Sequence, residues 1–100
     1  MKVNINSVHF KADRKLVTFI EQKIEKLSVF HDGILGGDVS LKLANQPDGG
    51  NKITEIRLNI RGTDLFAKKQ SNSFEEATDL AVEALRRQLK KHKEKTRKKY

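Results

Sequence analysis

Cysteine is absent from the 100 residues of this chain, and tryptophan is absent as well. Without cysteine there is no disulfide framework, no thiol nucleophile and no thiolate-bound metal, and the composition suits a reducing compartment. No apolar run approaches the roughly 20 residues that span a bilayer. The start of the chain, residues 2–6, alternates polar and apolar residues and has no signal-peptide core. We therefore expect one soluble domain in the cytoplasm.

Residue patterns typical of catalysis or of cofactor binding are also missing. The three histidines are dispersed along the sequence, so no metal site is expected. Gly33, Gly36 and Gly37 lack the lysine and hydroxyl of a phosphate-binding loop, and we interpret them as turn glycines. No pair of carboxylates and no activated serine stands out. The sequence predicts a protein that is not an enzyme and that has no cofactor and no small-molecule substrate.

Acidic residues are nearly absent from the last fifteen positions, 86–100. Nine of these residues are basic and only Glu94 is acidic, which gives this stretch a formal charge of +8, equal to that of the whole chain. Residues 1–85 are therefore neutral overall. Such segregated positive charge favours polyanionic partners, with nucleic acid first and an anionic surface second.

Alternating apolar and polar residues predict four strands. These are residue 2 to about residue 10, residues 39–44, residues 56–61 and a shorter strand over residues 65–70. Residues 45–51 are rich in turn-forming types and hold the only proline. Each predicted strand has one apolar and one polar face, as expected of an antiparallel sheet with one solvated side.

Apolar residues at helical spacing predict two helices. Asp13 is the N-cap candidate of the first helix, which should end near Phe30, and Asn72 or Ser73 caps the second, which should continue to about Lys95. The apolar stripes are Leu16, Val17, Ile20, Ile24 and Leu27 in the first helix and Phe74, Ala77, Thr78, Ala81, Leu85 and Leu89 in the second. With a length of roughly 35 Å, the second helix should extend beyond strands of roughly 20–27 Å.

The element order β-α-β-β-β-α leaves one apolar sheet face for both helices. We therefore predict an α+β fold, a two-layer sandwich in which a four-stranded sheet carries two helices on one face. Residues 1–95 should form the single domain. Residues 96–100 should form a flexible basic tail, because little apolar surface remains after Leu89 and like charges repel at helical spacing.

The basic end of the second helix is the first candidate for a binding site. Positive charge that is concentrated on a docked helix is typical of a surface that contacts phosphates. On the first helix, Lys23 and Lys26 could extend this surface or be ordinary solvated lysines. The candidate RNA-binding residues are Lys23, Lys26, Arg86, Arg87, Lys90, Lys91, Lys93 and Lys95.

The polar sheet face is a weaker candidate for RNA binding. RNA-recognition sheets stack bases on two or three aromatic side chains, and only Phe66 is available here. The polar residues that we place on this face are Lys42, Arg57, Asn59 and Arg61. We interpret the face as a solvated surface.

The second helix contains a stretch that resembles a known family. Residues 72–79, Asn-Ser-Phe-Glu-Glu-Ala-Thr-Asp, are followed by Leu85, Arg87, Gln88, Leu89 and Lys91. This pattern resembles the ribosome hibernation-promoting factors, also called ribosome-associated inhibitor or sigma-54 modulation proteins, which commonly have Leu-x-Arg-Gln-Leu-x-Lys there. Lys23 and Lys26 fall where that family has basic residues. Asn-Ser-Phe at 72–74 departs from the family's Asp-Met-Tyr.

The resemblance covers essentially the whole chain and implies both a fold and a function. The fold would be like a double-stranded-RNA-binding domain with an extra first strand, in the short form of the family. Members bind the small ribosomal subunit with its 16S ribosomal RNA, block the mRNA and tRNA channel, and inhibit translation in resting cells. We expect the same partner here, no membrane partner, and a monomer when the protein is free.

Two alternative functions stay open at this point. One is a general double-stranded RNA-binding module of the same architecture. The other is a protein-interaction module whose polybasic tail binds an acidic protein or a lipid surface. The absence of an apolar stripe after Leu89 argues against membrane insertion but not against electrostatic docking.

Overall fold

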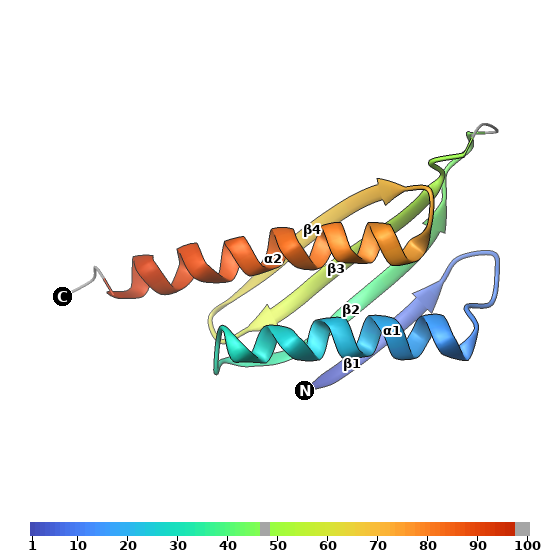
Figure 1. The fold of residues 1–100 in the computed structure, drawn as a ribbon. Coiled ribbons are helices and arrows are strands. Elements are labelled where there is room, and N and C mark those ends of the chain that lie inside the picture. Colours follow the sequence, from blue (N-terminus) through green and yellow to red (C-terminus); the bar gives the residue numbers. More distant parts are fainter. Residues whose placement is uncertain (47–48, 98–100) are drawn as a thin grey trace.

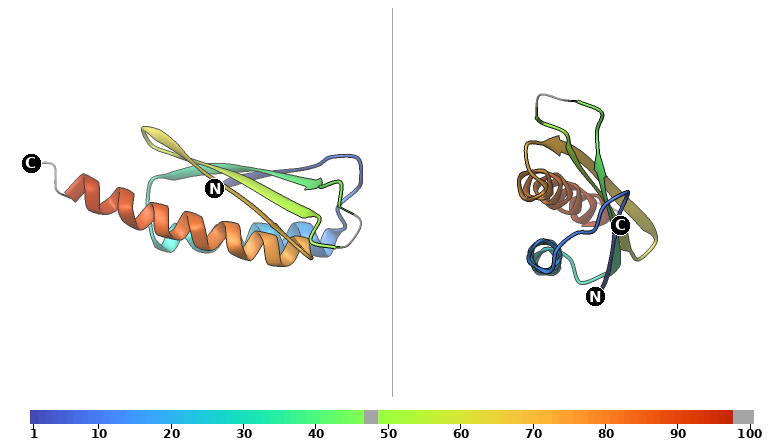
Figure 2. Two further views of the ribbon diagram at one scale, coloured as in Figure 1. Left: turned by 90° about the horizontal axis from the view of Figure 1, so that it is seen from above. Right: turned by 90° about the vertical axis from the view of Figure 1, so that its right-hand side faces the viewer.

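The computed structural model describes residues 1–46 and 49–97, with the side chains of α2 described as far as Lys93. The elements are β1 (Lys2–Ser7), α1 (Arg14–Glu25), the short 3-10 helix η1 (Lys26–Val29), β2 (Ile34–Leu43), β3 (Lys52–Ile60), β4 (Thr63–Ser71) and α2 (Phe74–Arg97). Both helices cover the same face of one four-stranded sheet (Figure 1, Figure 2). The predicted α+β two-layer sandwich is confirmed.

The sheet is mixed, and the expectation of an antiparallel sheet is wrong for its first pair of strands. Strand order follows chain order, with β1 parallel to β2 and the other two pairings antiparallel. The connection explains the difference, because α1 crosses the sheet between β1 and β2 and brings the chain back to the same starting end. Alternation of residue types has the same period in both kinds of pairing, so it does not distinguish them.

Two glycines that we interpreted as turn residues lie inside β2 instead. Gly36 and Gly37 are buried and pair with Lys2 and Val3 of β1. A Cβ atom at Gly36 would lie only 2.6 Å from the carbonyl oxygen of Lys2. Because that neighbour is backbone and cannot swing away, glycine is required where the two strands approach.

The hairpin of β3 and β4 is longer than predicted. The two strands pair along their full lengths, and the turn between them consists of Arg61 and Gly62 alone. Gly62 has a φ of 91°, a conformation that favours glycine. Thr63 and Asp64, which precede the strand predicted over residues 65–70, are therefore the first ladder residues of β4.

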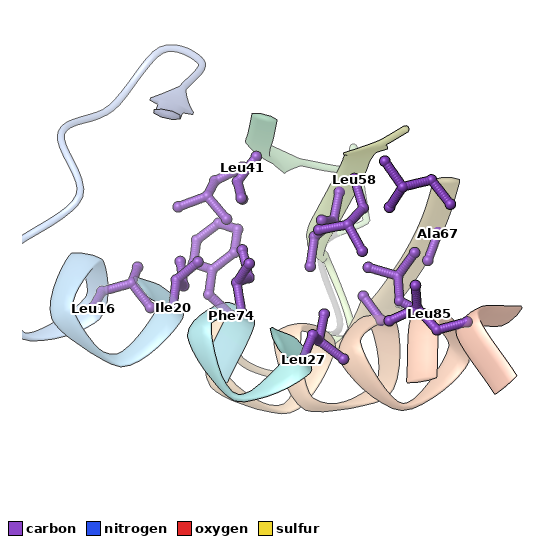
Figure 3. Close-up of a cluster of buried hydrophobic side chains, with 14 residues drawn as sticks. Leu16, Ile20, Leu27, Leu41, Leu58, Ala67, Phe74 and Leu85 are labelled. Atoms are coloured by element: carbon purple, nitrogen blue, oxygen red, sulfur yellow. The ribbon is translucent and has the colours of Figure 1, made fainter. Parts of the chain in front are cut away.

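The core lies between the sheet and the two helices, and it uses both predicted apolar stripes (Figure 3). All the stripe residues are buried except Val17, which is half-buried. Full burial of each Leu or Ile contributes about 1.5–3 kcal/mol. Among the described residues, Thr54 and Thr78 are the two that are polar and buried, and their hydroxyl oxygens lie 3.4 Å apart.

Both helices begin at the predicted caps. The backbone N–H of Leu16 donates to Asp13 Oδ1 at 2.8 Å, and the N–H of Glu76 donates to Ser73 Oγ at 3.1 Å. The Glu76 carboxylate accepts a hydrogen bond from the hydroxyl of Ser71 at 2.7 Å. In a capping box the carboxylate of Glu76 would instead accept a hydrogen bond from the backbone N–H of the N-cap residue. Here that carboxylate is hydrogen-bonded to β4.

The end of α2 extends beyond the sheet, as its length predicts. Figure 1 shows the C-terminal part of the helix passing the turn between β3 and β4. The helix continues to Arg97, two residues past the predicted end at Lys95. Residues 96 and 97 are therefore helical rather than part of a separate tail, and the expected tail residues 98–100 lie outside the described residues.

Candidate nucleic-acid interface

The C-terminal half of α2, which we call its basic half, packs against the core. Leu85 and Leu89 are fully buried, and the Gln88 side chain donates a hydrogen bond to the carbonyl oxygen of Phe66 in β4 at 2.9 Å. Four exposed basic residues share this segment, and we call them the basic face: Arg87, Lys90, Lys91 and Lys93. Because the core fixes their backbone, little backbone order has to be created when they bind a partner.

The charges of the basic face are available to a partner. Within the residues that the structure describes, none of its four side chains forms an ion pair. Four of the five acidic residues of α2 precede the basic face along the helix, and Glu94 follows it. The four that precede it are Glu75, Glu76, Asp79 and Glu83. This order also suits the helix dipole, which favours acids near the N-terminus and bases near the C-terminus.

Arg86 differs from the basic face because it already has partners. Its Nε atom donates to Glu83 Oε2 at 3.0 Å, a second guanidinium nitrogen contacts the other carboxylate oxygen, and the guanidinium lies 5.8 Å from the ring centroid of Phe30. The hydrogen bond lowers the pKa of Glu83 and raises the pKa of Arg86. Arg86 is therefore partly neutralised and is held against the end of η1.

Lys23 is also paired, and its partner lies on the other helix. Its ammonium nitrogen lies 2.9 Å from Asp79 Oδ1 and 5.4 Å from the ring centroid of Phe19. The pair joins α1 to α2. Lys23 therefore lies beside α2, with its charge balanced by an acid that sequence reasoning did not assign to it.

Lys26 and Lys95 complete the set of predicted residues. Lys26 is exposed at the start of η1, and it forms no ion pair with the described residues. The contact between Arg86 and Phe30 shows that η1 ends beside the basic half of α2. Lys95 belongs to the helical backbone of α2, and its side chain lies outside the described residues.

The open face of the sheet has acids and bases that neutralise one another. Glu55 Oε2 lies 3.1 Å from the ammonium nitrogen of Lys42 and 3.8 Å from that of Lys68. Arg57 Nη1 lies 3.9 Å from Asp64 Oδ2, and the guanidinium carbon of Arg57 lies 5.6 Å from the ring centroid of Phe66. These pairs leave the face with mixed rather than positive charge, in keeping with its interpretation as a solvated surface.

Three residues that are far apart in the sequence lie close together at one end of the sheet. The rings of His31 and His92 have centroids 5.5 Å apart, and both residues line a hollow together with Arg61. Arg61 belongs to the hairpin turn, so its placement on the open sheet face is wrong. No sequence signal links the three residues, since each comes from a different part of the chain.

Within the described part of the chain, no group of three or more His, Asp or Glu side chains could hold a metal ion. No described helix is both long and apolar enough to cross a membrane.

The sequence matches the family described as sigma 54 modulation protein / S30EA ribosomal protein over residues 3–97. It is similar to the ribosome hibernation promotion factor of Bacillus subtilis (strain 168), with 29% identity over 100 residues, which is all of this chain and 52% of that protein. The chain therefore spans about half the length of that relative. The ribosome hibernation promoting factor of Pseudomonas putida KT2440 is 30% identical over 95 residues, covering 95% of this chain and 89% of that one.

Two solved structures share the fold. The N-terminal domain of Thermus thermophilus protein Y has a TM-score of 0.80 and 22% identity, covering 92% of this chain and 99% of that one. A ribosomal subunit interface protein from Coxiella burnetii has a TM-score of 0.83 and 19% identity, covering 93% and 98%. At these identities the similarity establishes the arrangement of strands and helices.

Proposed function

The chain belongs to the sigma 54 modulation protein / S30EA ribosomal protein family, and from this premise we propose that it is a ribosome hibernation factor. It binds the small ribosomal subunit, occupies the channel of mRNA and tRNA, and thereby inhibits translation in resting cells. The relatives that are named ribosome hibernation factors support the class of function. The observation that carries the RNA-binding part is the basic face, exposed, unpaired among the described residues and anchored to the core.

Phosphates of 16S ribosomal RNA are the expected ligands of the basic face. Lysine and arginine contacts to phosphates supply affinity and orientation without reading sequence. A rigid helix with several cations suits folded RNA, which proteins recognise largely by shape, phosphates and 2′-hydroxyl groups. Lys26, exposed at the start of η1, extends the contact beyond α2.

The distribution of acids indicates how the protein is oriented on RNA. Glu75 and Glu76 lie in the first turn of α2, and Asp79 and Glu83 follow before the basic face begins. Phosphates repel these carboxylates. We therefore propose that the projecting end of α2 points into the RNA, while the beginning of α2 and the mixed-charge sheet face point away.

Binding to purified subunits tests this function. The protein should co-sediment with small subunits and not with large ones, lower the yield of cell-free translation, and be displaced by mRNA together with tRNA. Equal affinity for small subunits and for a free RNA duplex would favour the general double-stranded RNA-binding module instead. Capture from lysate that survives RNase treatment would favour an acidic protein partner.

A further inference from the structure

A hollow of about 360 Å³ lies at the end of the sheet where β2 begins and where β3 turns into β4. Its lining residues are His31, Asp32, Gly33, Arg61 and His92. His92 lies in α2 between Lys91 and Lys93 of the basic face. The hollow is therefore adjacent to the surface that we assign to RNA.

Backbone contacts fix the shape of this hollow. The backbone N–H of Gly33 donates to His31 Nδ1 at 2.8 Å, and the N–H of Arg61 donates to the carbonyl oxygen of Gly33 at 3.1 Å. A Cβ atom at residue 33 would lie 2.7 Å from Cε1 of His31. The imidazole therefore occupies space that a larger residue at position 33 would take. The turn holds the ring of His31 and the backbone of Arg61 in place.

The chemical groups of the hollow suit an anion. Because Nδ1 of His31 accepts a hydrogen bond, the neutral ring has its proton on Nε2, which is then a donor. Arg61 is exposed and offers the several N–H groups of its guanidinium. The imidazole of His92 lies beside that of His31, with ring centroids 5.5 Å apart. Asp32 is the one acidic group among the lining residues.

We propose that this hollow binds a phosphate group, through Arg61 and His31 with His92 at its wall. The phosphate belongs to an RNA strand that continues from the basic face. This inference rests on the proposed function for the identity of the RNA, whereas the donor set by itself suits any phosphate. Charge-assisted hydrogen bonds to a guanidinium are among the stronger contacts available to a phosphate.

Charge-matched variants separate this pocket from general electrostatics. Arg61→Gln should weaken small-subunit binding about tenfold, whereas Arg14→Gln, an equal charge change on exposed α1, should change it less than about twofold. Asp32→Asn should tighten binding by about twofold to fivefold, with Glu21→Gln on α1 as its control. A gain of affinity in Asp32→Asn is not explained by damage to the fold.

A second readout uses the two histidine rings. Their ¹⁵N-labelled side-chain resonances are followed by NMR while inorganic phosphate, or a short single-stranded RNA, is added to the whole protein. We expect both rings to shift with RNA, and Arg61→Gln to abolish the shift. A shift with RNA alone identifies a phosphate within a strand, and an equal shift with inorganic phosphate identifies a general phosphate site.

The two readouts distinguish failure of the pocket from failure of the function. If the protein binds small subunits but Arg61→Gln behaves like Arg14→Gln, the pocket inference is wrong and the proposed function stands. If small subunits are not bound but phosphate or RNA still shifts the rings in an Arg61-dependent way, the pocket stands and the function fails. If neither ligand shifts either ring, the pocket inference is overturned.

Discussion

Removal of three charges from the basic face tests the proposed interface most directly. The variant combines Arg87→Gln, Lys90→Gln and Lys91→Gln. All three side chains are exposed and without ion pairs among the described residues. Glutamine keeps most of the helix propensity of lysine and arginine. The substitutions should therefore change RNA affinity while the fold is retained.

The expected size of the effect follows from the number of available cations. The basic face and Lys26 supply five cations that form no ion pair with the described residues. Each phosphate contact contributes about −0.7 to −0.9 to the slope of log K against log salt, where K is the association constant. Five contacts should therefore give a slope of about −3.5 to −4.5. Raising salt from about 50 to 200 mM should then weaken the wild-type protein about 100- to 500-fold. The variant retains two of the five cations, and its loss over the same range should be only about tenfold.

Fluorescence anisotropy of labelled protein with small subunits, at several salt concentrations, measures both the affinity and its slope. The matched control is Lys11→Gln, Arg14→Gln and Lys69→Gln, which removes the same charge from exposed positions outside α2. A basic-face variant with unchanged slope would refute the assignment. Equal weakening by the control would show that net charge, rather than the basic face, determines binding.

Three further predictions concern the ion pair beside the basic face and the stability of the fold. Glu83→Gln should free Arg86 and tighten RNA binding severalfold in the anisotropy assay. Because the hydrogen bond from Arg86 holds the pKa of Glu83 below its ordinary value of 4.5, the pair stabilises the fold above that value. Its contribution is lost as pH falls through the lowered pKa, so the Tm difference between Glu83→Gln and wild type should vanish in acid. Leu89→Ala should destabilise the protein by about 2–5 kcal/mol in urea unfolding, and a smaller loss would show that α2 is not anchored there. Gly36→Ala should cost about 1–3 kcal/mol by the same assay, because its Cβ would press on the carbonyl of Lys2, and unchanged stability would contradict that contact.

Local chemistry made much of the fold predictable from the sequence alone. Helical spacing identified the buried stripe that ends at Leu89, and short-range hydrogen bonding identified Asp13 and Ser73 as caps. The segregation of charge into residues 86–100 is likewise a property of the sequence. Each of these signals depends on residues a few positions apart, so no knowledge of the tertiary fold is needed to read it.

Contacts between distant segments were decided only by the tertiary structure. The parallel pairing of β1 with β2, and the place of Gly36 within it, depend on the path of α1 across the sheet. The partner of Lys23 is Asp79 because two helices pack side by side. The hollow between His31 and His92 exists because the residues before β2 and the basic half of α2 meet at one end of the sheet. Hydrophobic burial sets this arrangement, and the polar residues that it brings together share no pattern in sequence.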